Sequence, residues 1–224
     1  MSYKALLLDF YGTLVKPDDD LVENVICAVA ARSPILDATP LVRARWWQLM
    51  RTMCLESHGD HYQSQRDIEL ISLRRVLDEY QVDLDPGALC TDIFANWEAP
   101  VPYPDVIEFL NRLTVPVCIV SNIDEADIRS AMRVNHWDFP LLVTSETCHA
   151  YKPRRELFGA GLKKLGLSAR EVLHAGDSVS ADVIGGLNYG IDVAWVNRLQ
   201  RALPSPNPTY CCADLDELAG VLGF

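Results

Sequence analysis

The chain has 224 residues, of which 49% are hydrophobic and 23% are charged, a composition typical of a globular protein. Its formal net charge of −11 argues against nucleic acid as a partner, because an acidic protein repels the phosphate backbone. No apolar stretch approaches the length of a membrane span, so no membrane partner is expected. Residues 1–4 lead directly into an apolar segment and leave no room for a signal peptide, which favours a cytoplasmic location. The seven cysteines include no Cys-x-x-Cys pair and are expected to be small buried hydrophobes in a reducing compartment.

The first predicted element is a buried strand over residues 5–8, an apolar run that ends at Asp9. In an open α/β sheet, ligands bind just beyond the carboxyl ends of the strands. A carboxylate at that point, followed by Gly12 for a sharp turn, is a candidate nucleophile. The residues alone leave a second interpretation open, in which Asp9 only caps a turn.

The segment from residue 16 to residue 100 contains no convincing strand and predicts helices over 18–31, 41–54, 65–80 and 86–97. Its acidic run, residues 18–20, is expected to be solvated at a helix start. Both linkers of this segment flank the predicted strand-end cleft, which favours a lid that excludes water. A helical subdomain with no role at the site is the alternative.

From about residue 103, predicted helices and strands alternate, which indicates a Rossmann-like parallel sheet and an α/β fold. His174 lies on an apolar strand and is expected to be a core residue rather than a metal ligand. The helices are predicted over 104–113, 124–134, 153–165, 181–190 and from 214 onward, and the strands over 117–120, 141–144, 172–175 and 193–196.

Four short motifs follow one another along the chain: Asp9, then Ser121-Asn122, then Lys152-Pro153, then Gly176-Asp177 with Asp182 five residues later. In this order and spacing the chain resembles the haloacid dehalogenase superfamily of hydrolases. The resemblance covers essentially the whole chain. It implies a Rossmann-like core formed by residues 1–15 and 101–224, with a helical cap over residues 16–100 inserted after the first motif.

The resemblance also implies roles for the motif residues. Asp9 would be the nucleophile that forms a covalent intermediate. Ser121, next to the further candidate Asn122, would hydrogen-bond an anionic substrate oxygen, and Lys152 would balance the charge on it.

The resemblance further implies a Mg²⁺ ion, which prefers oxygen ligands. The implied ligands are the carboxylates of Asp9 and Asp177 and the backbone carbonyl of Tyr11. Asp182 would support the site or the waters on the metal. The ion would screen the repulsion between Asp9 and a phosphate.

Tyr11 departs from the pattern of the family's phosphatases, which carry at this position a second Asp that protonates the leaving group. Loss of a positioned general acid reduces the rate by about 10²- to 10⁴-fold, unless the leaving group needs no proton. Tyrosine here resembles the family's 2-haloacid dehalogenases, whereas Gly176-Asp177 with Asp182 resembles its metal-dependent phosphatases.

We therefore expect a Mg²⁺-dependent phosphatase for a small anionic metabolite with a good leaving group, acting as a monomer or homodimer. A 2-haloacid dehalogenase is the first alternative, and a non-catalytic binding protein of the same fold is the second. Arg43, Arg45 and Arg51 lie beside two tryptophans and could receive a halide, although an amphipathic helix explains the same pattern. The family's phosphonate hydrolases use a cap lysine to form a Schiff base with the substrate. That activity is disfavoured here, because no lysine lies between Lys16 and Lys152.

Overall fold

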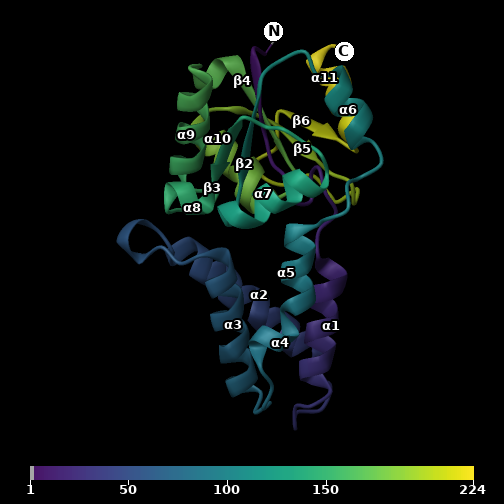
Figure 1. Cartoon of the computed structure of the whole chain (residues 1–224), viewed down its shortest axis with the longest axis vertical. Coiled ribbons are helices and arrows are strands. Elements are labelled where there is room, and N and C mark those ends of the chain that lie inside the picture. Colours follow the sequence, from purple (N-terminus) through teal and green to yellow (C-terminus); the bar gives the residue numbers. More distant parts are fainter. Residues whose placement is uncertain (1–2) are drawn as a thin grey trace.

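The computed structural model describes residues 3–224, so the first two residues of the predicted core segment lie outside the described residues. One parallel sheet runs through the upper part of the molecule in the order β3-β2-β1-β4-β5-β6 (Figure 1). Its strands are β1 (Ala5–Leu8), β2 (Val117–Ser121), β3 (Leu141–Thr144), β4 (Val172–Gly176), β5 (Asp192–Val196) and β6 (Tyr210–Cys212). This sheet confirms the predicted Rossmann-like α/β fold, with the short edge strand β6 as an addition that was not predicted.

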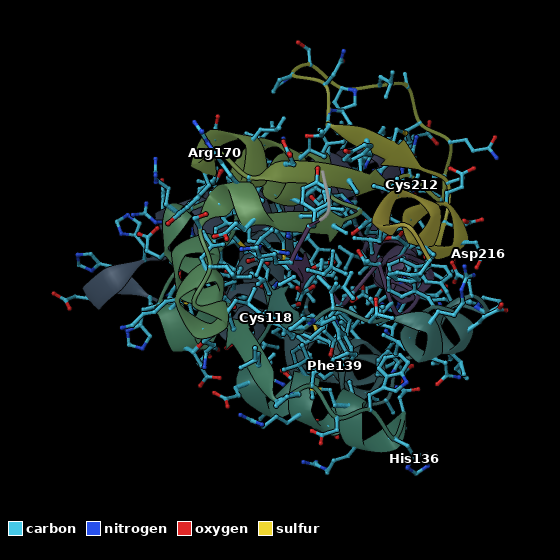
Figure 2. The ribbon with its side chains drawn as sticks, turned by 90° about the horizontal axis from the view of Figure 1, so that it is seen from above. Cys118, His136, Phe139, Arg170, Cys212 and Asp216 are labelled. Atoms are coloured by element: carbon cyan, nitrogen blue, oxygen red, sulfur yellow. The ribbon has the colours of Figure 1, made fainter. Side chains whose placement is uncertain are left out.

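Helices cover both faces of the sheet because successive strand residues point to opposite sides. Leu6 and Leu8 pack on one face and Leu7 on the other, all fully buried. Seen from above, Cys118 lies among the packed side chains of the core, whereas His136 projects from its edge (Figure 2). The first face is covered by α6 (Val106–Arg112), α7 (Glu125–Val134) and α11 (Leu215–Leu222), and the second by α9 (Arg155–Leu165) and α10 (Ile184–Tyr189), while α8 (Ser145–Cys148) follows β3.

The residues predicted to form the cap fold as helices that lie together below the sheet in Figure 1. They are α1 (Asp19–Ala30), α2 (Thr39–Glu56), α3 (Gln65–Glu79), α4 (Pro86–Leu89) and α5 (Thr91–Glu98). The helix predicted over 86–97 is divided into α4 and α5 at Cys90, so its continuity was wrong. The division of the chain into domains at residues 16 and 100 stays a prediction.

Two groups of hydrogen bonds fix the cap helices against the core. The Asp124 carboxylate accepts the first backbone N–H groups of α3, from Gln65 at 2.8 Å and Arg66 at 3.1 Å. A carboxylate at a helix N-terminus accepts hydrogen bonds from free N–H groups and interacts favourably with the positive end of the helix dipole. The Tyr11 hydroxyl donates to the carbonyl of Trp97, at 2.5 Å, near the end of α5. The cap is thus held over the carboxyl end of β1.

All seven cysteines are free thiols. The expected burial is found for Cys90, Cys118 and Cys212, but Cys27 and Cys211 are exposed, so the expectation was wrong for those two. Among the helices of residues 3–224, none is both long and apolar enough to cross a membrane.

Candidate active site

The candidate nucleophile lies where the central strand of the sheet ends. Asp9 follows β1 directly and is 5% exposed. One carboxylate oxygen, Oδ2, accepts a hydrogen bond from the Thr13 hydroxyl at 3.0 Å, a contact that the sequence pattern does not predict. Because β2 and β4 flank β1, the ends of these strands bring Ser121 and Asp177 to the same edge. The predicted juxtaposition of the first and last motifs is therefore present.

Lys152 is the cation of this site, and it is 4% exposed in the loop before α9. Its Nζ atom donates to Asp9 Oδ1 at 2.7 Å, to Asp182 Oδ1 at 2.7 Å and to the carbonyl of Val120 at 2.9 Å. Burial alone would lower the pKa of Lys152, but Asp182 and Asp9 outweigh this effect and raise it. Lys152 therefore stays protonated and ties the two carboxylates together.

Asp182 has hydrogen-bond donors at both oxygens. Besides Lys152, it accepts from the backbone N–H of Ser178 at 3.0 Å, and its Oδ1 lies 2.9 Å from His174 Nε2. Burial would raise the pKa of Asp182, but Lys152 and His174 outweigh burial and lower it. A Cβ atom on Gly176 would lie 2.3 Å from the Asp182 carboxyl carbon, so this approach requires glycine.

His174 is buried, as the sequence predicts, with Nδ1 3.2 Å from the carbonyl of Leu7. Its contact with Asp182 was missed. The available signal was a histidine two residues before Gly176 in an otherwise apolar strand.

Three carboxylates converge on one point of the site. Single oxygens of Asp9, Asp177 and Asp182 all lie within 4.8 Å of one another. Burial and the charges of Asp9 and Asp182 raise the pKa of Asp177 to about 8, and burial also raises the pKa of Asp9 despite Lys152. One lysine leaves this cluster with excess negative charge, and a hard dication would compensate it.

The free oxygens of the cluster also fit a metal ion. Within residues 3–224 the carbonyl of Tyr11 and the carboxylate of Asp177 accept no hydrogen bond. Each oxygen of Asp9 accepts one, whereas Asp182 accepts three. Asp9, Asp177 and the Tyr11 carbonyl are therefore better suited to be direct ligands than Asp182. Gly12 has φ +84°, and a Cβ there would lie 2.6 Å from Asp177 Oδ1, so only glycine leaves room for that carboxylate.

The side chains of Tyr11 and Asn122 are occupied by structural contacts. The Tyr11 hydroxyl proton is used on the carbonyl of Trp97, and burial raises the pKa of Tyr11 above its usual value. The Asn122 side chain accepts the backbone N–H of Lys152 at 2.7 Å and donates to the carbonyl of Lys152 at 3.1 Å. Asn122 thus positions Lys152, and Ser121 is buried beside it at the end of β2.

A cavity of about 250 Å³ lies between this site and the cap. Gly12, Asn122 and Asp177 line it from the core. Aromatic side chains dominate the wall from the cap, contributed by Trp46, Trp47 and Trp97. No arginine or lysine of residues 3–224 lines this cavity.

Two further carboxylates, from the cap and its linker, line the same cavity. Glu69 on α3 is 2% exposed, and its carboxylate makes no hydrogen bond within residues 3–224. Burial and then the charge of Asp18 raise the pKa of Glu69 to about 8. Asp18 accepts a hydrogen bond from Trp97 Nε1 at 2.7 Å, and burial raises its pKa. The expectation of a solvated acidic run therefore holds for the exposed Asp19 and Asp20 but is wrong for Asp18.

Substituting Glu69 with glutamine should stabilise the ligand-free protein. A carboxyl group with a raised pKa binds more protons when folded than when unfolded, so the wild type loses stability as pH rises from about 4.5 to 8. Glu69→Gln removes this loss, so the free energy of unfolding should rise by up to about 3 kcal/mol at pH 7. Urea unfolding at pH 5 and pH 8 measures it, and a gain that is equal at both values would contradict the prediction.

The cap arginines do not reach the cavity. Arg43 pairs with Glu23 of α1, and Arg45 pairs with Glu79 of α3 at 2.6 Å. Arg51 is exposed on α2. These contacts agree with an amphipathic helix rather than with a halide-binding group.

Known proteins resemble the chain over most of its length. A pyrimidine 5'-nucleotidase, YjjG of Escherichia coli, is 30% identical over 150 residues, which are 63% of this chain and 66% of that protein. The (S)-2-haloacid dehalogenase 2 of Pseudomonas sp. (strain CBS-3) is 28% identical over 131 residues, 55% of this chain and 56% of that protein. The match thus spans less than two thirds of the length of either relative.

Solved structures share the fold. The L-2-haloacid dehalogenase from Xanthobacter autotrophicus superposes with a TM-score of 0.76 over 98% of both chains at 20% identity. The sequence profile of the haloacid dehalogenase-like hydrolases matches residues 3–190. The chain belongs to the family of haloacid dehalogenase-like hydrolases.

Proposed function

We propose that the protein is a Mg²⁺-dependent phosphohydrolase for a small phosphorylated metabolite with a good leaving group. The observation that carries this proposal is the convergence of Asp9, Asp177 and Asp182 around a single lysine. Such an excess of negative charge beside a nucleophile hinders attack on an anionic phosphate. A bound Mg²⁺ ion would neutralise this charge and polarise the phosphoryl group.

The residues of the chain supply the remaining parts of the reaction. An Asp9 oxygen forms a bond to phosphorus while the bond from phosphorus to the leaving oxygen breaks. Water then attacks the phosphorus of this aspartyl phosphate, which releases inorganic phosphate and restores Asp9. Lys152 holds Asp9 in place and offsets charge on the phosphoryl oxygens.

The environment of Tyr11 supports the restriction to good leaving groups. Its hydroxyl proton is committed to the carbonyl of Trp97, and its pKa is raised, so it is a poor proton donor to a leaving alkoxide. The carboxylate of an acyl phosphate and the phenolate of an aryl phosphate are stable anions, so they leave without that proton. Acyl phosphates and aryl phosphates are therefore the substrates that this site favours.

A 2-haloacid dehalogenase is the second candidate, supported by Tyr11 and by the relative and the solved structure that bear that name. The cavity argues against it. A 2-haloacid carries a carboxylate, and the cavity offers it Asp18 and Glu69 but no arginine or lysine among residues 3–224. Bringing like charges together in a cavity of low polarity is unfavourable.

Hydrolysis of p-nitrophenyl phosphate and acetyl phosphate should require Mg²⁺ and should exceed hydrolysis of simple alkyl phosphates by at least about 10²-fold in kcat/KM. Phosphate release with Mg²⁺, with EDTA and with EDTA followed by excess Mg²⁺ tests this. Turnover that EDTA leaves unchanged would contradict the proposal.

Halide release from L-2-chloropropionate in EDTA would instead establish the second candidate. A folded protein that turns over neither class of substrate would favour the non-catalytic binding protein.

A further inference from the structure

We infer that the cavity between the core and the cap binds an alkylammonium group, so that the preferred substrate is a small phosphate ester with a positively charged nitrogen. This inference deepens the proposed function and rests on it for the phosphate end of the substrate. It stands on the composition of the cavity wall, on an unpartnered buried carboxylate and on the direct connection to the catalytic carboxylates.

The wall of the cavity is suited to an organic cation. Trp46, Trp47, Trp97 and Tyr11 all line it. Trp47 lines the cavity and keeps 43% of its surface exposed, which is unusual for a tryptophan. The faces of aromatic rings attract ammonium groups, and aromatic cages are a recurrent means of binding quaternary ammonium ions.

Glu69 provides the complementary charge when a cation binds beside it, because a neighbouring positive charge favours the ionised carboxylate and opposes the burial that raises its pKa. It is 2% exposed, lines the cavity, and has no hydrogen-bond or ion-pair partner within residues 3–224. A buried carboxylate without a partner is unfavourable, so a group of this kind in a cavity wall calls for a ligand that satisfies it. Asp18 adds a second carboxylate on the same wall, and no cationic side chain among residues 3–224 lines the cavity to compete for either.

The cavity joins this wall to the reaction centre. Asp177 and Gly12, which belong to the catalytic edge of the sheet, line the same 250 Å³ as Glu69 on α3. A substrate can therefore place its phosphate beside Asp177, at the edge of the sheet where Asp9 follows β1, and its nitrogen among the tryptophans. Lys152 and the implied metal attract the phosphate, whereas Glu69 and Asp18 attract the ammonium group.

Binding of the isolated cation tests the inference without any need for turnover. Tryptophan fluorescence titrations should compare choline with its uncharged isostere, 3,3-dimethylbutan-1-ol, and with ethylammonium as the primary amine. Choline or ethylammonium should bind at least about 10-fold more tightly than the isostere. The comparison of choline with ethylammonium identifies whether the nitrogen is quaternary or primary.

Substitutions test whether the preference for the cation over its uncharged isostere arises in the cavity. Glu69→Gln keeps the shape of the side chain and should remove at least about 10-fold of the affinity for the cation while leaving the isostere unchanged. Asp78→Asn removes the same charge from an exposed position of α3 and should change neither. If Glu69→Gln is poorly folded by circular dichroism, Asp18→Asn takes its place. Binding of both choline and ethylammonium no tighter than that of the isostere, or no binding of either cation, would overturn the inference.

Kinetics separate this inference from the proposed function. The phosphates of 4-[(trimethylammonio)methyl]phenol and 4-neopentylphenol have the same shape, both release a phenolate and differ in charge, so a kcat/KM at least about 10-fold higher for the cationic ester supports the inference. Hydrolysis of both at equal rates with Mg²⁺ would refute the inference and leave the phosphohydrolase intact. Cation binding that depends on Glu69, without hydrolysis of any phosphate ester, would refute the phosphohydrolase and leave the cation site intact.

Discussion

Asp9→Asn should lower turnover of the best phosphate ester by at least about 10⁴-fold and leave the protein folded. An amide oxygen cannot form the covalent intermediate, and loss of a covalent nucleophile has effects of this size or larger in other hydrolases. The free energy of unfolding should not fall, because Lys152 keeps Asp182 and the carbonyl of Val120 as partners and the substitution removes one of three crowded carboxylates. Single-turnover phosphate release and urea unfolding measure the two quantities.

An exposed aspartate supplies the control for this prediction. Asp20→Asn on α1 changes the net charge equally and should leave turnover unchanged. Retention of more than about 1% of wild-type turnover by Asp9→Asn would rule out Asp9 as the nucleophile. A single turnover in ¹⁸O-labelled water then adds a chemical readout. Attack of water on the phosphorus of an aspartyl phosphate puts the label in the released phosphate. Attack of water on the carboxyl carbon of an Asp9 ester, the intermediate of a dehalogenase, puts it in the Asp9 carboxylate.

The parts of the structure that depend on local sequence pattern could be predicted. The apolar runs that end at Asp9, Ser121 and Gly176 form adjacent parallel strands, so the motif residues meet at one edge of the sheet. The strand β6, over 210–212, was missed because three residues with two exposed side chains carry little hydrophobic pattern. Cys90, with φ −87° and ψ 0°, separates α4 from α5, and the amino-acid composition of this segment does not predict that break.

The cavity could not be predicted, because it depends on the packing of segments that are distant in sequence. Asp18 belongs to an acidic run that is typical of a solvated helix start, and only the hydrogen bond from Trp97, 79 residues later, draws it inward. Glu69 lies between Ile68 and Leu70 on α3, and its burial follows from the packing of α3 against α2. The spacing of charges along one helix contains no information on such neighbours. A buried carboxylate without a partner becomes visible only when all its neighbours are known.

Lys152→Met should destabilise the protein by about 3–5 kcal/mol at pH 8 and abolish turnover. Methionine preserves the length of the side chain but leaves Asp9 and Asp182 buried without their shared cation, and removal of one member of a buried ion pair has this magnitude. In the wild type, the lowered pKa of Asp182 contributes stability that is present above its unfolded pKa. Without the lysine the sign reverses for Asp182, because burial and the charge of Asp9 then raise its pKa, and the pKa of Asp9, already raised in the wild type, rises further.

The reversed sign makes the effect of this substitution depend on pH. The folded variant binds more protons than the unfolded chain, so its stability falls as pH rises, and the deficit relative to the wild type should shrink between pH 8 and pH 5. Lys163→Met, at an exposed position of α9, is the matched control and should stay within about 0.5 kcal/mol of the wild type. Urea unfolding of the three proteins at both pH values gives the comparison. A Lys152→Met protein as stable as the wild type at pH 8 would mean that Asp9 and Asp182 are not held together by this lysine, and the charge argument for a dication at Asp9 would lose its basis.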